Sequence, residues 1–599
     1  MRRRKEEEWQ ELILELVDRH WAWLVVLVWL GFCASFLITK WSDIHFFNLA
    51  DTDDNMRMMQ VRGLLSGQGW YDLRQHHLNA PLGANIHWSR LVDLPLAGLI
   101  LALRPFVGGA EAERWAVTIA PMLPYLLLLL SLALIVRRLV DRRAYPLAFL
   151  GLFFAGSTNG MFMPTRIDHH GWQLALLALC VAAIADPKKV RGGLLLGIGT
   201  ALSLAIGLEM LIYLAIAASV TVLLWVADAA DRERLRAYAV ALGGGTGIAF
   251  LLFASNDNWN AVCDALSPVW LSDAALGGAI LFGLSLLSPG GWKKRLMLAL
   301  GAGAVIAAFH GLMWPHCLTR LEGVSPQVEQ LWLSHVREAR PVYRHGWRIA
   351  SLVVALPITG AIGWGLLAYW KRADREALRR ILAAALPGLV AALLLLWQTR
   401  TGPAAQMLAT VGVAAILWNL VPRTWNAKRS LVRVVGTLAL VVIGGGALLP
   451  LVLRYFPEPA ATADGLAIRR ANYLCNSFWA YKPVAALPKG VVFTFIDFGP
   501  RLITATHHDS IAGPYHRNGA QIADVMNAFR GSADQAHALI GKYRSNYLLV
   551  CPNSSTTTIF RAEAPKGFYQ QLAHNQVPTW LTPIDLGKDS PFRMWRVTG

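Results

Sequence analysis

The chain has 599 residues, of which 55% are hydrophobic and only 16% are charged, and its mean hydropathy is +0.41. A soluble domain of this length needs more charge to cover its surface, so the composition excludes an ordinary soluble enzyme and indicates a membrane protein. The net charge of +18 is also typical of nucleic-acid-binding proteins, but here the basic residues lie in short clusters between apolar runs, as topology signals do. Nucleic acid is therefore not an expected partner.

The N-terminal segment is charged. Residues 1–5 are basic, and residues 6–18 are acidic and amphipathic. No small-residue cleavage site follows the first apolar run, so we expect an uncleaved start. Residues 1–20 are predicted to form a cytoplasmic surface helix that leads into the first membrane span.

Long apolar runs dominate the next part of the chain. A run of roughly 17–25 apolar residues crosses a bilayer core, and about thirteen such runs occur here. We therefore predict a mostly α fold, with a polytopic transmembrane domain over residues 21–453 and a C-terminal α/β domain over residues 454–599. The runs lie at 21–40, 116–136, 145–162, 171–185, 193–209, 210–228, 238–254, 273–288, 296–313, 348–369, 381–397, 404–420 and 431–453.

Clusters of basic residues set the orientation. Six of them fall on the same side as the basic N-terminus when the spans are counted in this way. They lie at 137–143, 188–191, 232–236, 293–295, 371–380 and 423–429. The positive-inside rule places that side in the cytoplasm, and an odd number of spans then exports the tail. We expect a multi-pass protein of the bacterial inner membrane, with its N-terminus cytoplasmic and its C-terminal domain periplasmic.

The cysteines agree with this orientation. Two of the six lie in apolar spans, and the other four fall on the predicted outer side, where disulfides persist. We expect the pairs Cys263–Cys317 and Cys475–Cys551, although sequence alone does not fix the connectivity.

The first outer loop, residues 41–115, opens with Asp51, Asp53 and Asp54. Carboxylates this close repel one another unless a cation or a proton is shared. Asp53 and Asp54 are therefore candidate catalytic residues, and Asp54 is also a candidate ligand of Mg²⁺ or Mn²⁺. The alternative is a plain cap of the helix predicted for residues 56–65.

The rest of this loop carries further candidates. Asp51, Arg57 and His87 are candidates for contacting the acceptor. The apolar run at 94–106 is too short to cross a bilayer, so we expect an interfacial or re-entrant helix there.

A second polar constellation lies between the third and fourth spans. Arg166, Asp168, His169 and His170 are costly at a membrane boundary unless they have partners. Asp168 is a candidate catalytic residue, and Asp168 and His169 are candidate metal ligands together with Asp54. Arg166 and His170 are candidates for binding a donor phosphate. The alternative is a helix cap with interfacial histidines.

The later outer segments add candidates. Arg400, in a short loop between the eleventh and twelfth spans, either snorkels as an anchor or binds a lipid phosphate with its guanidinium fork. The loop at 314–347 contains Glu322 and Glu338, and its stretch 326–340 is predicted to be an amphipathic helix that either covers a substrate or is simply solvated.

The tail alternates strand-like and helical runs, which indicates a small α/β domain. It contains His508 and His516 within a polar loop, residues 506–518. This loop either faces the active site or has ordinary turn chemistry.

The string Asp53-Asp54-Asn55-Met56-Arg57, followed by Gly67-Gln68-Gly69, resembles the acidic loop and glycine turn of the GT-C glycosyltransferases. The layout is most similar to the catalytic subunits of oligosaccharyltransferases. That resemblance implies an acidic motif at Asp168, a flexible loop at 314–347 and a phosphate-binding arginine at Arg400. It also implies a sugar donor on polyprenyl phosphate or pyrophosphate, and a glycan, lipid or protein acceptor.

One element of that branch is missing. The tail has no WWD-type signature, and Phe478-Trp479-Ala480-Tyr481 is not one, so glycosylation of asparagine sequons is not expected. The arabinosyl and aminoarabinosyl branches resemble the first loop equally well.

A different class, a lipid or polysaccharide transporter or flippase, stays open. It should show repeated halves and ionisable residues near the middle of the membrane. We find no clear repeat, and Glu209 is the only acidic residue close to a span interior. A non-catalytic polysaccharide-assembly scaffold is a third alternative, but it would not need clustered aspartates.

Overall fold

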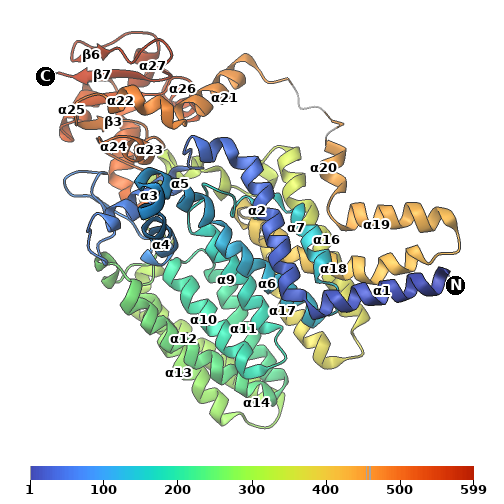
Figure 1. Ribbon diagram of the computed structural model, residues 1–599. Helices are drawn as coiled ribbons and strands as arrows, with labels where there is room; N and C mark the ends of the chain where they lie inside the picture. Colours follow the sequence, from blue (N-terminus) through green and yellow to red (C-terminus); the bar gives the residue numbers. More distant parts are fainter. Residues whose placement is uncertain (1, 454, 457–459, 599) are drawn as a thin grey trace.

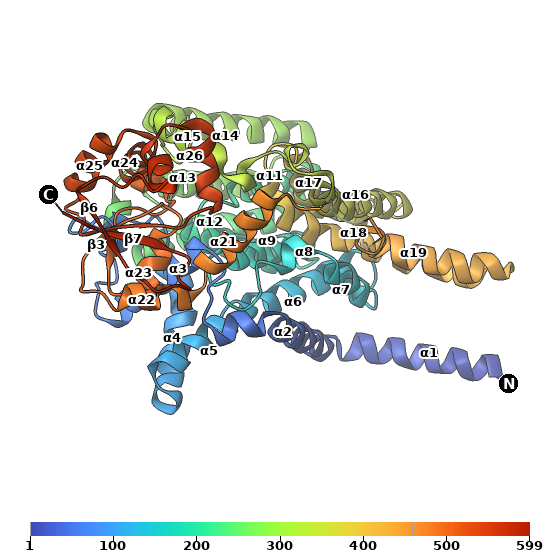
Figure 2. The same cartoon turned by 90° about the horizontal axis from the view of Figure 1, so that it is seen from above.

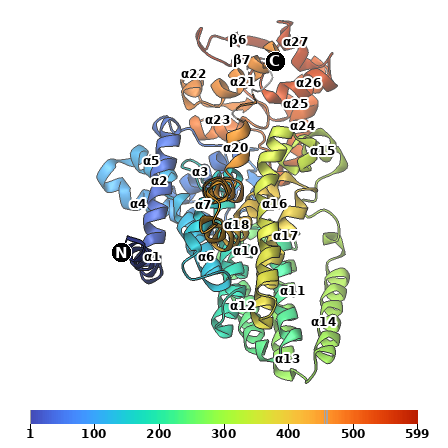
Figure 3. The same ribbon diagram turned by 90° about the vertical axis from the view of Figure 1, so that its right-hand side faces the viewer.

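The computed structural model describes residues 2–453, 455–456 and 460–598. A helical bundle makes up most of the molecule, and a smaller domain with a five-stranded sheet packs on one end of it (Figures 1 and 3). The predicted mostly α fold with a C-terminal α/β domain is confirmed. The predicted boundary between the two parts lies beside residue 454, which falls outside the described residues.

Nine helices of the described chain are long and apolar enough to cross a membrane. Their helical elements are α2 (Trp21–His45), the consecutive α5 (Gly109–Ile119) and α6 (Met122–Leu139), α10 (Lys189–Ile206), α12 (Arg232–Phe253), α13 (Pro268–Leu287), α14 (Trp292–Met313), α16 (Trp347–Trp370), α17 (Arg375–Leu394) and α18 (Gly402–Trp425).

Four of the thirteen predicted spans are shorter or interrupted in the structure. The run at 145–162 breaks after Phe153, and the run at 431–453 breaks at its glycines. Gly446, with a φ of +84°, stands between two helices in a conformation that glycine adopts without strain and that ends helices. The shorter helices are α7 (Tyr145–Phe153), α8 (Gly156–Asn159), α9 (His170–Ile184), α11 (Leu211–Ala227), α19 (Thr437–Gly444) and α20 (Leu448–Leu453).

Small residues allow the central helices to pack closely. A Cβ atom on Gly363 of α16 would lie 2.1 Å from the carbonyl oxygen of Gly412 in α18. A Cβ atom on Gly360 would lie 2.4 Å from Ala409 of α18. Such contacts are typical of helix pairs in membranes, where close van der Waals packing drives association. Helix α18 is consequently buried along most of its length.

The first outer loop folds into α3 (Thr52–Leu65), a hairpin of β1 (Arg74–Gln75) and β2 (Ala84–Asn85), and α4 (Arg90–Val107). The helix predicted for 94–106 is present as α4, which forms a hairpin with α5 that projects from the body, as does α1 (Arg2–Arg19) (Figure 2). The hairpin ends in exposed Phe106 and Val107, as an interfacial element does.

The loop at 314–347 differs from its prediction. Only α15 (Pro326–Leu331) is α-helical, and two 3-10 turns (Leu333–His335 and Arg337–Ala339) replace the rest of the helix predicted for 326–340. Val328 and Leu331 of α15 are buried in the core of the C-terminal domain. Farther along, the backbone N–H of Thr399 donates to the carbonyl oxygen of Arg340 (2.9 Å). Anchoring at both ends by tertiary contacts therefore overrides the local helical pattern.

The C-terminal domain has its own hydrophobic core. Its sheet has the strand order β4-β3-β5-β7-β6, in which β4, β3 and β5 are parallel and β7 and β6 are antiparallel to their neighbours. The strands are β3 (Val491–Phe493), β4 (Asp509–Ser510), β5 (Tyr547–Val550), β6 (Leu581–Ile584) and β7 (Arg593–Val597). The helices are α21 (Ala463–Cys475), α22 (Lys482–Ala485), α23 (Gly499–Ala505), α24 (Gly519–Arg530), α25 (Ala533–Lys542), α26 (Ser555–Glu563) and α27 (Phe568–Ala573).

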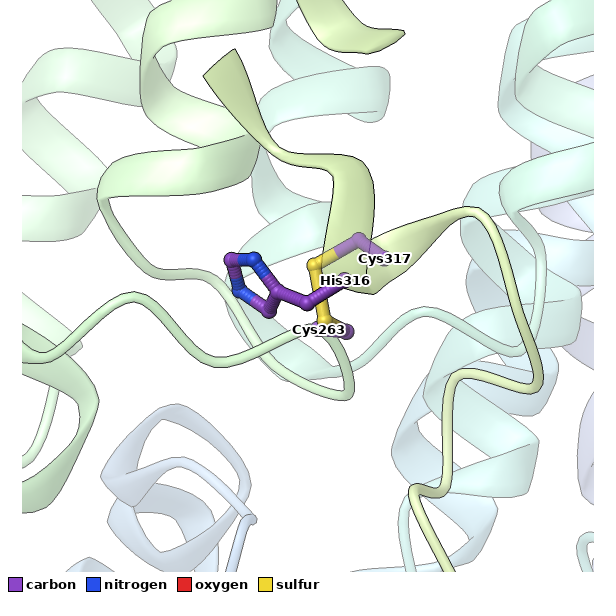
Figure 4. A group of neighbouring side chains, drawn as sticks. All are labelled: Cys263, His316 and Cys317. Carbon is purple, nitrogen blue, oxygen red and sulfur yellow. A yellow bond between two sulfur atoms is a disulfide. The ribbon is translucent and has the colours of Figure 1, made fainter. Parts of the chain in front are cut away.

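Both predicted disulfides are present. Cys475–Cys551 joins α21 to the end of β5, with Cα atoms 6.4 Å apart, and Cys263–Cys317 joins the segment before α13 to the one after α14, with Cα atoms 5.4 Å apart. His316 lies beside the second bond (Figure 4), but its two sulfur neighbours are bonded to each other and are not free to ligate a metal.

Candidate active site

The site begins at the N-terminus of α3, where the acidic residues have separate roles. Asp51 is the N-cap residue: its side chain accepts hydrogen bonds from the backbone N–H groups of Asp53 (2.9 Å) and Asp54 (3.3 Å). The carboxylate of Asp54 accepts in return from the N–H of Asp51 (3.0 Å). This reciprocal capping box fixes the start of the helix.

Asp54 also ties the first loop to the second polar segment. Its Oδ1 atom accepts hydrogen bonds from the backbone N–H groups of Ile167 (2.6 Å) and Asp168 (3.0 Å). The residue is fully buried. The predicted convergence of the two segments is therefore present, but both oxygens of Asp54 are already used. This arrangement favours a structural role for Asp54 over the predicted roles of base and metal ligand.

Asp53 has the opposite environment. Within the described part of the chain, its half-buried carboxylate accepts no hydrogen bond and forms no ion pair. Burial, together with the negative charges of Asp168, Glu338 and Glu209, raises the pKa of Asp53 to about 7. A carboxylate that is unpartnered and basic for its type can accept a proton from a substrate.

Arg166 neutralises the aspartates around it. Its guanidinium contacts the carboxylate of Asp51, lies 3.7 Å from Asp54 Oδ2 and forms an ion pair of 2.8 Å with Asp168 Oδ2. Arg166 was predicted to bind a donor phosphate, but the guanidinium is enclosed by these carboxylates. The geometry instead assigns it the role of their counter-ion.

The two histidines that follow Asp168 meet at Glu209. His169 Nε2 lies 2.7 Å from Glu209 Oε1, and His170 Nδ1 lies 2.8 Å from Glu209 Oε2. The second nitrogen of His170, Nε2, lies 3.8 Å from Asp168 Oδ2. Glu209 sits between α10 and α11, and the only sequence signal for it is an acidic residue at the end of an apolar run.

His169 is held from both sides. Its Nδ1 atom lies 3.5 Å from the Nη2 atom of Arg57, which is buried, pairs with Asp93 (2.8 Å) and lies over the ring of Trp88. Both ring nitrogens of His169 therefore have partners. The predicted metal-ligand role suits His170 better than His169, and the predicted acceptor contact of Arg57 is replaced by internal support of the site.

The arginine predicted to bind phosphate does meet the outer loop. Arg400 Nη2 lies 2.8 Å from Glu338 Oε1, and both side chains are exposed. Glu338 contributes to the raised pKa of Asp53, so its charge is felt at the start of α3. Glu322 lies in a turn and makes no contact with these residues.

The two histidines of the tail lie in different places. His508 is buried inside the C-terminal domain, where its ring nitrogens contact the backbone of Val484 (2.9 Å) and Gly490 (3.2 Å). His516 lies beside His87, with ring centroids 4.4 Å apart. The structure therefore brings His87 and His516 together and leaves His508 with a structural role.

The acidic group fits a divalent cation. Carboxylate oxygens of Asp51, Asp54 and Asp168 lie within 4.8 Å of one another. Asp168 Oδ2 is buried and accepts no hydrogen bond of acceptable geometry from the described residues. Oxygen ligands with one imidazole suit Mg²⁺, Mn²⁺ or Zn²⁺. Asp51 and Asp54 are engaged in the capping box, so the candidates for ligation are Asp53, Asp168, whose Oδ2 also pairs with Arg166, and His170, whose Nε2 lies 3.8 Å from that oxygen.

The structure combines a helical bundle with long apolar helices, an acidic group built from its loops and a C-terminal α/β domain packed on the same end. No family model matches the chain, and no curated protein matches it.

Solved structures do match. One is the archaeal oligosaccharyltransferase AglB from Archaeoglobus fulgidus in complex with an inhibitory peptide and a dolichol-phosphate, at 14% identity and a TM-score of 0.68 over 95% of this chain and 73% of that chain. Another is the Archaeoglobus fulgidus oligosaccharyltransferase tethered with an acceptor peptide containing the NVT sequon. It has 15% identity and a TM-score of 0.64 over 92% of this chain and 72% of that chain. ArnT from Cupriavidus metallidurans bound to undecaprenyl phosphate has a TM-score of only 0.42, at 14% identity over 96% of this chain and 98% of that chain.

Structural similarity at such low sequence identity establishes the fold alone. The chain has the GT-C fold of the oligosaccharyltransferases, as the sequence resemblance implied, and it is a multi-pass membrane protein.

Proposed function

We propose that the protein transfers a sugar or oligosaccharide from a polyprenyl-phosphate or polyprenyl-pyrophosphate donor to a glycan, lipid or protein acceptor. The observation that carries this proposal is the unpartnered carboxylate of Asp53 beside Asp168 and His170. Transfer of a glycosyl group needs a base for the acceptor hydroxyl and positive charge for the departing phosphate. Both kinds of group are present.

Asp53 takes the acceptor proton or orients the acceptor nucleophile as it attacks the anomeric carbon. Arg400, in the 3-10 turn Thr399–Thr401 that precedes α18, binds the donor phosphate as its bond to the sugar breaks. Asp168 and His170 would hold a divalent cation, which would supply additional positive charge for the departing phosphate. Glu209, hydrogen-bonded to Nδ1 of His170, leaves Nε2 directed toward Asp168.

The fold supports the donor class. AglB, which shares this fold, was solved with a dolichol-phosphate, and dolichol-phosphate is a polyprenyl phosphate. The acceptor is less constrained, because the chain lacks the WWD signature expected of an enzyme that reads asparagine sequons.

The orientation belongs to the same proposal. Helix α3, which carries Asp53 and Asp54, and the C-terminal domain lie at the same end of the bundle (Figure 3). The positive-inside rule puts that end in the periplasm of a bacterial inner membrane. Polyprenyl-linked sugars presented there enter sideways from the outer leaflet. A flippase would instead carry ionisable groups along its spans, whereas the acidic group described here is borne on loops.

Donor turnover by the purified protein in lipid nanodiscs tests the proposal. A panel of synthetic polyprenyl-phosphate and pyrophosphate sugars is incubated with wild type, Asp53→Asn and Asp168→Asn, and the released lipid phosphate is quantified. Asp534→Asn, the same change at an exposed residue of α25, is the matched control. We expect turnover in wild type and the control and a loss of about 10²-fold or more in the two site variants. Full turnover in both site variants, or lipid movement across the bilayer without release of sugar, contradicts the proposal.

A further inference from the structure

A second cluster of metal-ligating side chains lies outside the acidic group, where three distant segments meet. His87 follows β2 in the first outer loop, Asp264 precedes α13, and His516 begins a 3-10 turn (His516–Asn518) of the C-terminal domain. His516 Nε2 lies 2.5 Å from Asp264 Oδ2. One ligand atom from each of the three side chains lies within 4.8 Å of the other two.

His87 leaves a nitrogen without a partner in this cluster. Its Nδ1 atom is buried and makes no hydrogen bond to any described residue. A buried polar atom without a partner is unfavourable and is rare in folded proteins, so its presence in a group of ligating side chains indicates an absent ligand.

We propose that His87, Asp264 and His516 bind a divalent transition-metal ion of the zinc type. Two imidazoles and one carboxylate are a common zinc ligand set, with ligand distances of about 2.0–2.2 Å. Ligand atoms of a tetrahedral site are then about 3.4 Å apart. The contact between His516 and Asp264 opens by roughly 1 Å to admit the ion, and His87 Nδ1 gains a partner.

Arg517 shapes this site from outside. Its Nε and Nη2 atoms donate to Asp264 Oδ2 (2.7 Å) and Oδ1 (2.6 Å), and its Nη1 atom donates to the side chains of Asn85 (3.0 Å) and Asn258 (2.8 Å). Hydrogen bonds of this kind orient a ligating carboxylate. Arg517 uses one lone pair of each Asp264 oxygen, so the ion takes the lone pair of Oδ2 that faces His516 Nε2.

The metal site would act as a clamp. The residue after His87 is Trp88, and the residue before His516 is Tyr515; their rings pack edge to face with centroids 5.6 Å apart. Tyr515 donates a hydrogen bond to the carbonyl oxygen of Thr52 at the start of α3 (3.0 Å). Binding at this site therefore fixes the C-terminal domain against the first loop, next to the acidic group.

Metal titration of the full chain tests the inference. The protein in detergent is stripped with a chelator and titrated with Co²⁺, whose visible absorption reports its coordination, and then with competing Zn²⁺. We expect wild type and Asp168→Asn to bind one ion that His87→Ala and His516→Ala do not bind. His574→Ala, the same change at an exposed histidine, is the control and keeps the ion.

Thermal unfolding separates lost binding from misfolding. At a hundredfold excess over Kd, Zn²⁺ should raise the Tm of wild type by about 2 °C. His87→Ala should keep the Tm of the metal-free wild type and show no rise. Equal numbers and affinities of ions in wild type, His87→Ala and His516→Ala overturn the inference. So does a protein whose only bound ion is lost in Asp168→Asn, a result that would instead assign that ion to the acidic group of the proposed active site.

Discussion

Asp53 and Asp54 are adjacent and chemically identical, yet the structure predicts opposite consequences when each is changed to asparagine. Asp54 accepts hydrogen bonds from the backbone N–H groups of Asp51, Ile167 and Asp168. Asparagine has one oxygen in place of two, so at least one buried N–H group loses its acceptor and faces an amide NH₂ group. Each such loss costs about 1–3 kcal/mol. Asp54→Ala, which removes all three acceptor contacts, should cost at least about 3 kcal/mol.

Asp53→Asn removes no described hydrogen bond and relieves repulsion from Asp168. Its free energy of unfolding should be within about 0.5 kcal/mol of wild type, the range of a change that breaks no contact. Its donor turnover, however, should fall by about 10²–10⁴-fold, the contribution of a general base.

Denaturant unfolding in mild detergent, followed by tryptophan fluorescence, and donor turnover in nanodiscs are measured on the same preparations. We expect the free energy of unfolding to be highest for Asp53→Asn, lower for Asp54→Asn and lowest for Asp54→Ala. Equal stability of Asp53→Asn and Asp54→Asn would refute the structural role of Asp54. A fully folded but inactive Asp54→Asn beside an active Asp53→Asn would reverse the assignment of the base.

Three further predictions concern the groups around Asp53. Glu209→Gln should lower donor turnover by about 10–100-fold, because partners that orient a metal-ligating histidine contribute about that much; Asp534→Asn is again the control, and unchanged turnover would exclude the role of Glu209. Arg400→Lys keeps the charge but loses the bidentate fork, so KM for the donor should rise about tenfold with a smaller change in kcat, and a kcat effect alone would contradict phosphate binding. Chelation should abolish donor turnover, and added Mg²⁺ or Mn²⁺ should restore it. Asp168→Asn should need a metal concentration at least about tenfold higher for the same recovery. Turnover that survives exhaustive chelation would remove the cation from the proposal.

The architecture could be predicted because each part of it has a local signal. Apolar runs predict the bundle, and alternating strand-like and helical runs predict the α/β domain. The position of four cysteines on one side predicts that disulfides form, whereas their pairing is fixed only by the folded chain. The span count was less predictable. Hydropathy does not show where a glycine run such as Gly444-Gly445-Gly446 ends a helix, nor that the helix beginning at Tyr145 stops after nine residues.

The sequence predicted which segments form the site, but not what each of their residues does there. Asp51 and Asp54 have the spacing of a capping box, which is a signal that could have marked Asp54 as structural. No such signal exists for Arg166, whose partner Asp51 lies 115 positions away. Glu209, Asp264 and Arg517 were missed as members of a site because isolated charged residues at helix ends or in loops have many uses. Their function depends on neighbours that only the folded chain supplies.

The pairing of Arg400 with Glu338 connects the outer loop to the donor. This exposed ion pair occupies the guanidinium group that we propose binds the donor phosphate. An exposed pair contributes little stability, so a phosphate with more than one negative charge and a bidentate geometry can displace Glu338. Displacement would release the side chain of Glu338, while the hydrogen bonds from Thr399 to the carbonyl oxygen of Arg340 would still hold the backbone nearby. If Arg400 binds the donor phosphate as proposed, we therefore expect donor binding to be coupled to the outer loop through the side chain of Glu338.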